Sequence, residues 1–92
     1  MTKKQTIKLP EYLKVINDEN RIAILQLLKK GPLCVCEIFP KLEISQNLVS
    51  HHLKVLKDCE LLESTRKGTK IIYARKNENI TRFQKLLAET IE

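Results

Sequence analysis

Two cysteines separated by one residue, Cys34 and Cys36, lie upstream of two adjacent histidines, His51 and His52. Thiolates and imidazoles are ligands for soft metal ions, and a thiolate beside an imidazole can also act as a nucleophile. Buried thiols can instead pack as small apolar groups in a core. The residue types alone therefore leave a metal site, a catalytic pair and a structural role open.

The geometry of the cysteine pair depends on the backbone that carries it. Successive residues of an α-helix turn by about 100°, so side chains two residues apart point roughly 200° apart. In an extended segment the same two side chains share one side. A short helix is expected over residues 33–42, so Cys34 and Cys36 can hold one ion only if the start of that helix is unwound or unwinds on binding.

A catalytic role for the pair is poorly supported. A cysteine nucleophile needs a base within hydrogen-bond reach and a group that orients the base. Cys36 and His51 could supply the first two, but the chain offers no third orienting group and no Gly-rich phosphate loop. We therefore expect no enzymatic activity.

The composition is that of one soluble domain. The chain has 92 residues, of which 42% are apolar and 30% charged. We expect the domain to cover residues 1–92, with residues 1–8 as a flexible arm. No run of about 18 or more apolar residues and no apolar leader occurs, which predicts a cytoplasmic protein without a membrane span. The odd number of cysteines argues against a disulfide framework, so reduced thiols are expected.

Positive charge is concentrated in one part of the chain. The formal net charge is +6, and residues 45–76 hold seven basic and three acidic side chains, which supply +4 of it. An excess of this sign favours a polyanionic partner. The segment that carries it is therefore the first place to look for a nucleic-acid interface.

Hydrophobic spacing predicts helices on both sides of this basic segment. Apolar residues recur at helical intervals in LPEYLKVIND, in DENRIAILQLL, in a short stretch limited by Pro40, and in the terminal NENITRFQKLLAETIE. The second of these helices is expected to end at Gly31 and Pro32. The organisation is mainly helical.

The basic segment itself combines a two-sided helix with a hairpin. Ser45 is a favourable N-cap, and Val49, Leu53 and Leu56 form an apolar stripe opposite a polar face. The following LLESTRKGTKIIYAR predicts two short strands around Gly68. A short helix, a turn, a capped polar helix and a basic hairpin predict a mainly α winged helix-turn-helix fold.

In such a fold the outward face of the polar helix can reach base edges, while its flank and the hairpin meet phosphates or the minor groove. The alternative is a solvated helix face and a charged hairpin with no partner. His52 lies toward Leu48 and Val55, which favours a structural role. The candidates for base contacts are Gln46, Asn47, Ser50 and His51, and those for phosphates or the minor groove are Lys54, Arg66, Lys67 and Lys70.

Three stretches together resemble the arsenic-repressor family (ArsR/SmtB) of winged-helix metal sensors. They are NDENRIAILQLL, LCVCEI, which is similar to the family's Leu-Cys-Val-Cys-Asp-Leu metal box, and SQNLVSHHLKVLKDCELL followed by RKGTKIIYA. The resemblance covers nearly the whole chain. It implies a homodimeric repressor, joined through its first and last helices, that leaves double-stranded operator DNA when a metal ion or metalloid binds. A last-helix stripe suits that interface, because it would otherwise be partly exposed: Ile80, Phe83, Leu87 and Ile91.

The resemblance also implies that Cys34 and Cys36 bind a soft inducer, with As(III) or Sb(III) favoured because thiolates select soft ions. These metalloids prefer three sulfurs, but Phe39 occupies the position at which the closest subgroup often has a third cysteine. Cys59 is expected to be structural, and the last helix has no histidine or cysteine for a zinc or cobalt site. Thiol-oxidation or persulfide sensing, inducer-independent DNA binding and a protein-interaction module remain open.

Overall fold

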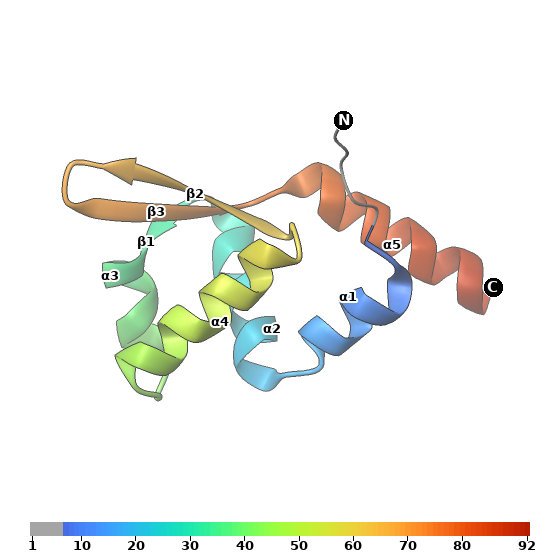
Figure 1. Ribbon diagram of the computed structural model, residues 1–92, viewed down its shortest axis with the longest axis horizontal. Coiled ribbons are helices and arrows are strands. Elements are labelled where there is room, and N and C mark those ends of the chain that lie inside the picture. The colour runs from blue at the N-terminus through green and yellow to red at the C-terminus, as the bar shows by residue number, and fades with distance from the viewer. Residues whose placement is uncertain (1–6) are drawn as a thin grey trace.

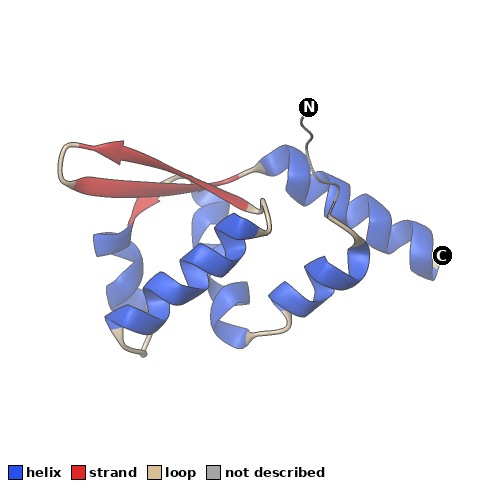
Figure 2. Ribbon diagram, in the orientation of Figure 1, coloured by secondary structure: helices blue, strands red, loops and turns tan. Residues whose placement is uncertain are grey.

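The structure is a computed structural model that describes residues 7–92. A small sheet lies along one edge of a group of helices (Figure 2). The α-helices are α1 (Leu9–Ile16), α2 (Glu19–Leu27), α3 (Val35–Ile38), α4 (Gln46–Asp58) and α5 (Asn77–Ile91). Short 3-10 helices follow two of them, η1 (Leu28–Lys30) after α2 and η2 (Phe39–Lys41) after α3.

The sheet is antiparallel and has the strand order β1-β3-β2, with β1 (Leu33–Cys34), β2 (Leu62–Lys67) and β3 (Lys70–Arg75). The predicted hairpin is confirmed, and Gly68 adopts φ +63° in its turn, a conformation that glycine reaches without steric cost. The strand β1 was not predicted from the sequence, because a two-residue strand has no periodicity. This strand exists only through its pairing with β3.

The predicted helix starts and stops are visible as hydrogen bonds. The Ser45 hydroxyl accepts a hydrogen bond from the Leu48 N–H at 3.2 Å and caps α4. The Asp18 carboxylate caps α2 in the same way by accepting from Asn20 and Arg21. The chain leaves the second helix at Gly31, which has φ +146°, as the sequence predicts.

The corner after α4 ties this helix to α5. Glu60 adopts φ +66°, and the Leu61 N–H donates to the Leu56 carbonyl at 3.0 Å, which closes the helix end. The Glu60 carboxylate accepts from Lys76 Nζ at 2.6 Å, and its carbonyl accepts from Asn79 Nδ2 at 2.8 Å. These bonds compensate the unusual backbone conformation and fix the start of α5 against the end of α4.

One hydrophobic core joins the helices to the sheet. The apolar stripe of α4 predicted from the sequence is confirmed, because its three residues are fully buried. The other contributors come from α1, α2, η1, α3, the corner after α4, the start of β2 and α5. The most deeply buried side chains are Tyr12, Ile24, Leu28, Ile38, Val49, Leu53, Leu56, Leu61 and Leu62.

The stripe of α5 is divided between two environments. Ile80 is buried, and the Phe83 ring packs on Tyr12 of α1 with the ring centroids 5.1 Å apart. Only the end of the helix leaves a large apolar side chain uncovered, at Ile91, which is 73% exposed. The stripe is therefore partly exposed, as expected from the sequence, with its first half covered by the chain itself.

The molecule is elongated, measuring 40 × 33 × 22 Å, with the β2–β3 hairpin at one end and α5 beside α1 at the other (Figure 1). Residues 1–6 of the expected arm lie outside the described residues. Of the arm's remaining residues, Ile7 packs against the core and the Lys8 N–H donates to the Glu11 carboxylate at 3.1 Å.

Candidate nucleic-acid interface and cysteine site

The outward face of α4 is fully available to solvent. The inward stripe anchors the helix to the core, so the polar side chains opposite it project from a fixed surface. The structure exposes all five residues predicted for this face: Gln46, Asn47, Ser50, His51 and Lys54. The helix can therefore present hydrogen-bonding groups to base edges without rearrangement.

Lys54 forms an ion pair within α4. Its Nζ lies 2.8 Å from Asp58 Oδ2, one turn further along α4. Both side chains are largely exposed, and solvent screens such pairs strongly. Lys54 can therefore exchange this carboxylate for a phosphate at little cost.

The hairpin carries its basic residues at the tip. Arg66, Lys67 and Lys70 are all exposed, and Lys67 lies directly opposite Lys70 across the strand pair. Like charges in this position repel each other. An anion placed between them would relieve that repulsion, as expected for a wing that contacts a phosphate backbone.

Other basic residues of the same segment have structural roles. The Arg75 guanidinium donates through Nη1 to the Leu25 carbonyl at 3.2 Å, which fastens β3 to α2. Lys76 is paired with Glu60. The positive charge available to a polyanion is therefore smaller than the count of basic residues indicates, and it is concentrated on α4 and the hairpin tip.

His52 does not belong to the outward face. It is buried, and its Nε2 lies 4.0 Å from the Asp18 carboxylate that caps α2. Within residues 7–92 its buried Nδ1 has no hydrogen-bond partner. The structure thus places His52 between α4 and α2, in agreement with the structural role predicted for it.

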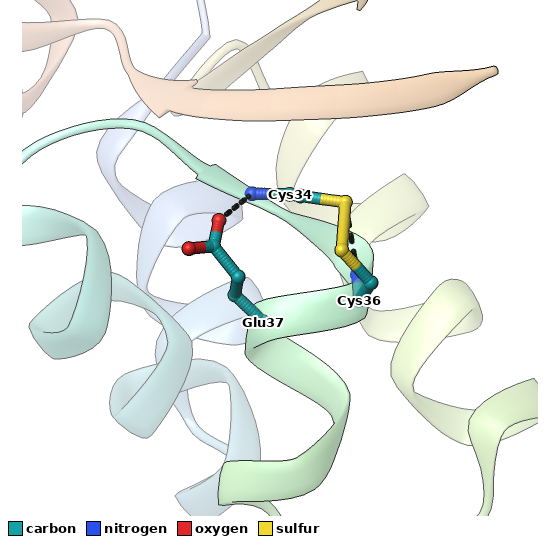
Figure 3. Close-up of a disulfide and its surroundings, with 3 residues drawn as sticks. All are labelled: Cys34, Cys36 and Glu37. Atoms are coloured by element: carbon teal, nitrogen blue, oxygen red, sulfur yellow. Dashed lines mark hydrogen bonds between the residues drawn. A yellow bond between two sulfur atoms is a disulfide. The ribbon is translucent and has the colours of Figure 1, made fainter.

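The cysteine pair spans the junction between β1 and α3 (Figure 3). Cys34 ends β1 in an extended conformation, with φ −72° and ψ 151°, and Cys36 lies in the first turn of α3. The two sulfur atoms face each other and are joined as a disulfide. The unwound helix start required for a shared ion is therefore present, but the two thiols, expected to be reduced, are in their oxidised form.

Backbone hydrogen bonds hold this arrangement. The Cys34 N–H donates to the Glu37 carboxylate at 2.8 Å, and the Cys36 N–H donates to Cys34 Sγ at 3.1 Å (Figure 3). Cys34 is buried whereas Cys36 is exposed, so a ligand from solvent reaches Cys36 first.

A complete metal centre is not formed in the part of the chain that the structure describes, where no three or more His, Cys, Asp or Glu residues cluster. Phe39 is half-buried and packs against the core. Cys59 belongs to that core and is only 7% exposed, as its predicted structural role requires. The site thus consists of two sulfurs from one strand–helix junction.

Cys36 and Cys59 should differ strongly in their rates of alkylation. Burial, with smaller contributions from Glu11 and Glu60, raises the pKa of Cys59 to about 11, so only about a thousandth is thiolate at pH 8. After reduction, a short iodoacetamide pulse should label Cys36 and leave Cys59 unmodified, as measured by peptide mass spectrometry. Labelling in guanidinium chloride is the control and should modify all three cysteines. Equal rates for Cys36 and Cys59 in the native protein would contradict the buried placement.

A capped helix with a polar outward face, preceded by a short helix and followed by a basic hairpin, defines a winged helix-turn-helix DNA-binding protein. Residues 18–64 match the family described as "Bacterial regulatory protein, arsR family". The chain belongs to this family, which consists of transcriptional regulators and not enzymes. No helix among residues 7–92 has the length and apolar character needed to cross a bilayer.

Known proteins resemble the chain in sequence and in fold. It is 39% identical over 71 residues to an arsenical resistance operon repressor of Staphylococcus xylosus, covering 77% of this chain and 68% of that protein. It is 34% identical over 76 residues to the cadmium resistance transcriptional regulatory protein CadC of Listeria innocua, covering 82% and 64%. The chain thus spans about two thirds of these relatives. HlyU from Vibrio cholerae superposes with a TM-score of 0.76 at 27% identity, covering 98% of each chain.

Proposed function

We propose that this protein is a homodimeric repressor that binds a pseudo-palindromic operator and leaves it when Cys34 and Cys36 bind a soft ion, with As(III) or Sb(III) favoured. The observation that carries the proposal is the pair of facing sulfurs at the junction of β1 and α3. Thiolates select soft ions, and the named relatives include an arsenical and a cadmium resistance regulator.

DNA is bound by α4 and the hairpin. The N-terminal residues of a recognition helix contact bases, and basic side chains on its flank and on the wing position the protein on the phosphates. Exposure on a rigid helix and repulsion at the hairpin tip support this assignment. The proposed base contacts are Gln46, Asn47, Ser50 and His51, and the proposed phosphate or minor-groove contacts are Lys54, Arg66, Lys67 and Lys70.

The cysteine pair lies between the two DNA-contacting elements. Cys34 is paired with Ile72 of the wing strand β3, while Cys36 belongs to α3, which leads through η2 and a short turn into α4. An ion that holds both sulfurs fixes the distance between these elements. If that distance differs from the one required on DNA, binding of ion and DNA are coupled, typically by about 1–3 kcal/mol.

The dimer forms through α1 and α5. These helices pack together at the end of the molecule opposite the hairpin tip. Ile80 and Phe83 pack within the chain. Leu13 of α1 and Ile91 of α5 stay exposed, by 40% and 73%, and a second copy could cover both. Two copies joined here would present two copies of α4 to an operator with matching symmetry.

Release by arsenite should depend on both cysteines. The DNA is an operator fragment selected from a random-sequence pool, and a phosphine keeps the thiols reduced. Arsenite should weaken the DNA binding of the wild type by about 5- to 150-fold, the range that corresponds to a coupling of 1–3 kcal/mol. The Cys34→Ser/Cys36→Ser protein should bind DNA normally and ignore arsenite. Serine at position 34 keeps an oxygen acceptor for the N-cap of α3. Fluorescence anisotropy measures both affinities.

Cys59→Ser is the matched control, because it removes a thiol that is buried away from solvent. It should keep the arsenite response. If Cys59→Ser lost the arsenite response and the double variant kept it, the inducer would bind at Cys59 and the proposal would be refuted. Salt-dependent DNA binding would also argue against a protein-interaction module, because released counterions steepen the salt slope.

Thiol oxidation is the second candidate, favoured by the disulfide itself. In that case an oxidised small-molecule disulfide accepts two electrons and two protons from Cys34 and Cys36, and is reduced to two thiols as the Cys34–Cys36 bond forms. DNA affinity would then differ between the reduced and oxidised protein. A reduced protein that ignores arsenite and an oxidised protein that releases DNA would favour this function over metalloid sensing.

A further inference from the structure

A groove beside β1 has no role in the proposed function. It lies between the end of α2, η1, β1 and the end of η2, and its volume is about 510 Å³. Small-molecule sites typically have volumes of about 300–1,000 Å³. Leu33, which lines the groove, and Cys34 are successive residues of an extended strand, so their side chains point to opposite sides. The groove is therefore separate from the cysteine pair.

The lining of the groove is mainly apolar and is held in place by the core. Leu27, Leu33 and Leu42 line the groove and also pack against the buried core. Ala23 adds a small apolar side chain from α2. Gly31 borders the same space, and a Cβ atom placed on it would meet nothing within 4 Å. A ligand can therefore enter beside this backbone without a rearrangement of the core.

Two lysines give the groove a positive charge. Lys30 from η1 and Lys41 from η2 both line it, and no acidic residue does. Within residues 7–92 neither lysine forms an ion pair. Gln26 adds a side-chain amide that can donate a hydrogen bond. Two positive charges beside an apolar surface are complementary to one anionic group that carries an apolar body.

We infer that this groove is a binding site for a small carboxylate with a hydrocarbon body. The carboxylate group is bound by Lys30, Lys41 and the Gln26 amide, and the hydrocarbon covers the leucines. The walls of the groove belong to α2 and to the turn that leads into α4, so the bound anion contacts both the supporting helices and the DNA-binding unit. The inference does not depend on which inducer the cysteine pair binds.

Charge and position argue against two other occupants. Residues 1–8 contain three lysines and no acidic residue, so the N-terminal arm has the same sign of charge as the groove. None of the lining residues comes from α1 or α5, so a second copy joined through those helices would not cover it. A free small anion matches the groove better than either.

The test uses three ligands that share one hydrocarbon chain and differ in charge: hexanoate, hexanol and hexylammonium. Binding is followed by NMR titration of the 15N-labelled protein without DNA. Hexanoate should bind about tenfold more tightly than hexanol, and hexylammonium should bind most weakly. The largest amide shifts should occur at Gly31, Leu33 and Leu42. The Cys34→Ser/Cys36→Ser protein should bind hexanoate as the wild type does.

Charge and space can be removed from the groove separately. Lys30→Gln/Lys41→Gln keeps the apolar lining and should lower the affinity for hexanoate to about that for hexanol. Lys29→Gln/Lys57→Gln removes the same formal charge outside the groove, and its affinity should stay within about twofold of the wild type. Ala23→Leu places a larger side chain in the groove and should weaken binding of all three ligands by about tenfold.

The outcomes either support the inference or overturn it. Equal affinities for hexanoate and hexanol would overturn the assignment to an anion, and shifts scattered over the surface without saturation would overturn the site. Lys30→Gln/Lys41→Gln might bind hexanoate normally and instead show a reduced salt slope in DNA binding. The two lysines would then serve DNA phosphates, which would also overturn the inference. A carboxylate preference that Lys30→Gln/Lys41→Gln abolishes, with binding blocked by Ala23→Leu, would support it.

Discussion

Replacing Asn47 with alanine should weaken binding to the selected operator by about 1–3 kcal/mol for each base pair that it reads, which is about 5- to 150-fold. Binding to unrelated DNA should stay nearly unchanged. Asn47 is exposed in the first turn of α4, where recognition helices contact bases, and an asparagine amide can donate to and accept from one adenine. Anisotropy titrations with operator and random-sequence DNA measure both affinities. The specificity ratio should fall while the fold is unchanged.

Substitutions in the β2–β3 hairpin should have a different effect from Asn47→Ala. Arg66→Gln/Lys67→Gln should weaken binding to operator and random DNA alike, and should reduce the slope of log affinity against log salt by about 0.9 for each phosphate that is no longer neutralised. Lys29→Gln/Lys30→Gln removes the same formal charge from η1, which contacts β3 but belongs neither to α4 nor to the hairpin tip, and should leave that slope nearly unchanged. If Asn47→Ala weakened both kinds of DNA equally, the outward face of α4 would not be reading bases.

Leu53→Ala should lower the free energy of unfolding by about 2–5 kcal/mol, because it removes a fully buried side chain and leaves a cavity. The free energy of unfolding of a small domain is only about 5–15 kcal/mol, so this loss should unfold much of the protein at 37 °C and reduce DNA binding accordingly. Urea denaturation at one protein concentration measures the change. The concentration is held constant because dimerisation stabilises the folded chain by mass action.

Leu48→Ala is the control for this effect, since it makes the same truncation on the same helix. Leu48 is 47% exposed, and its removal should change stability by no more than about 0.5 kcal/mol. Equal destabilisation by the two substitutions would mean that α4 does not pack on the core through its predicted stripe.

Much of the fold follows from local patterns in the sequence. The spacing of Val49, Leu53 and Leu56 identifies the buried face of α4, Ser45 marks its start, and Gly68 marks the hairpin turn. Each of these signals acts within a few residues, through helical periodicity, a capping hydroxyl or a backbone conformation open to glycine. The winged helix-turn-helix order could therefore be predicted without knowing any long-range contact.

Parts of the interface could not be predicted in this way. Whether Arg75 faces DNA or the Leu25 carbonyl depends on how β3 lies against α2, fifty residues earlier in the chain. The division of the α5 stripe between Tyr12 and solvent depends likewise on the packing of α1. Charge and periodicity indicate that such side chains seek partners, but they do not identify the partners.

The cysteine pair combines the two kinds of information. The sequence by itself determined the number of thiols, their separation by one residue and the phenylalanine where a third sulfur would complete the site. Only the tertiary structure decided that Cys34 and Cys36 face each other, because the extended conformation of Cys34 comes from pairing β1 with a strand almost forty residues later. Spacing along a chain limits what two side chains can bind, while the backbone path, fixed by distant contacts, decides whether their atoms meet.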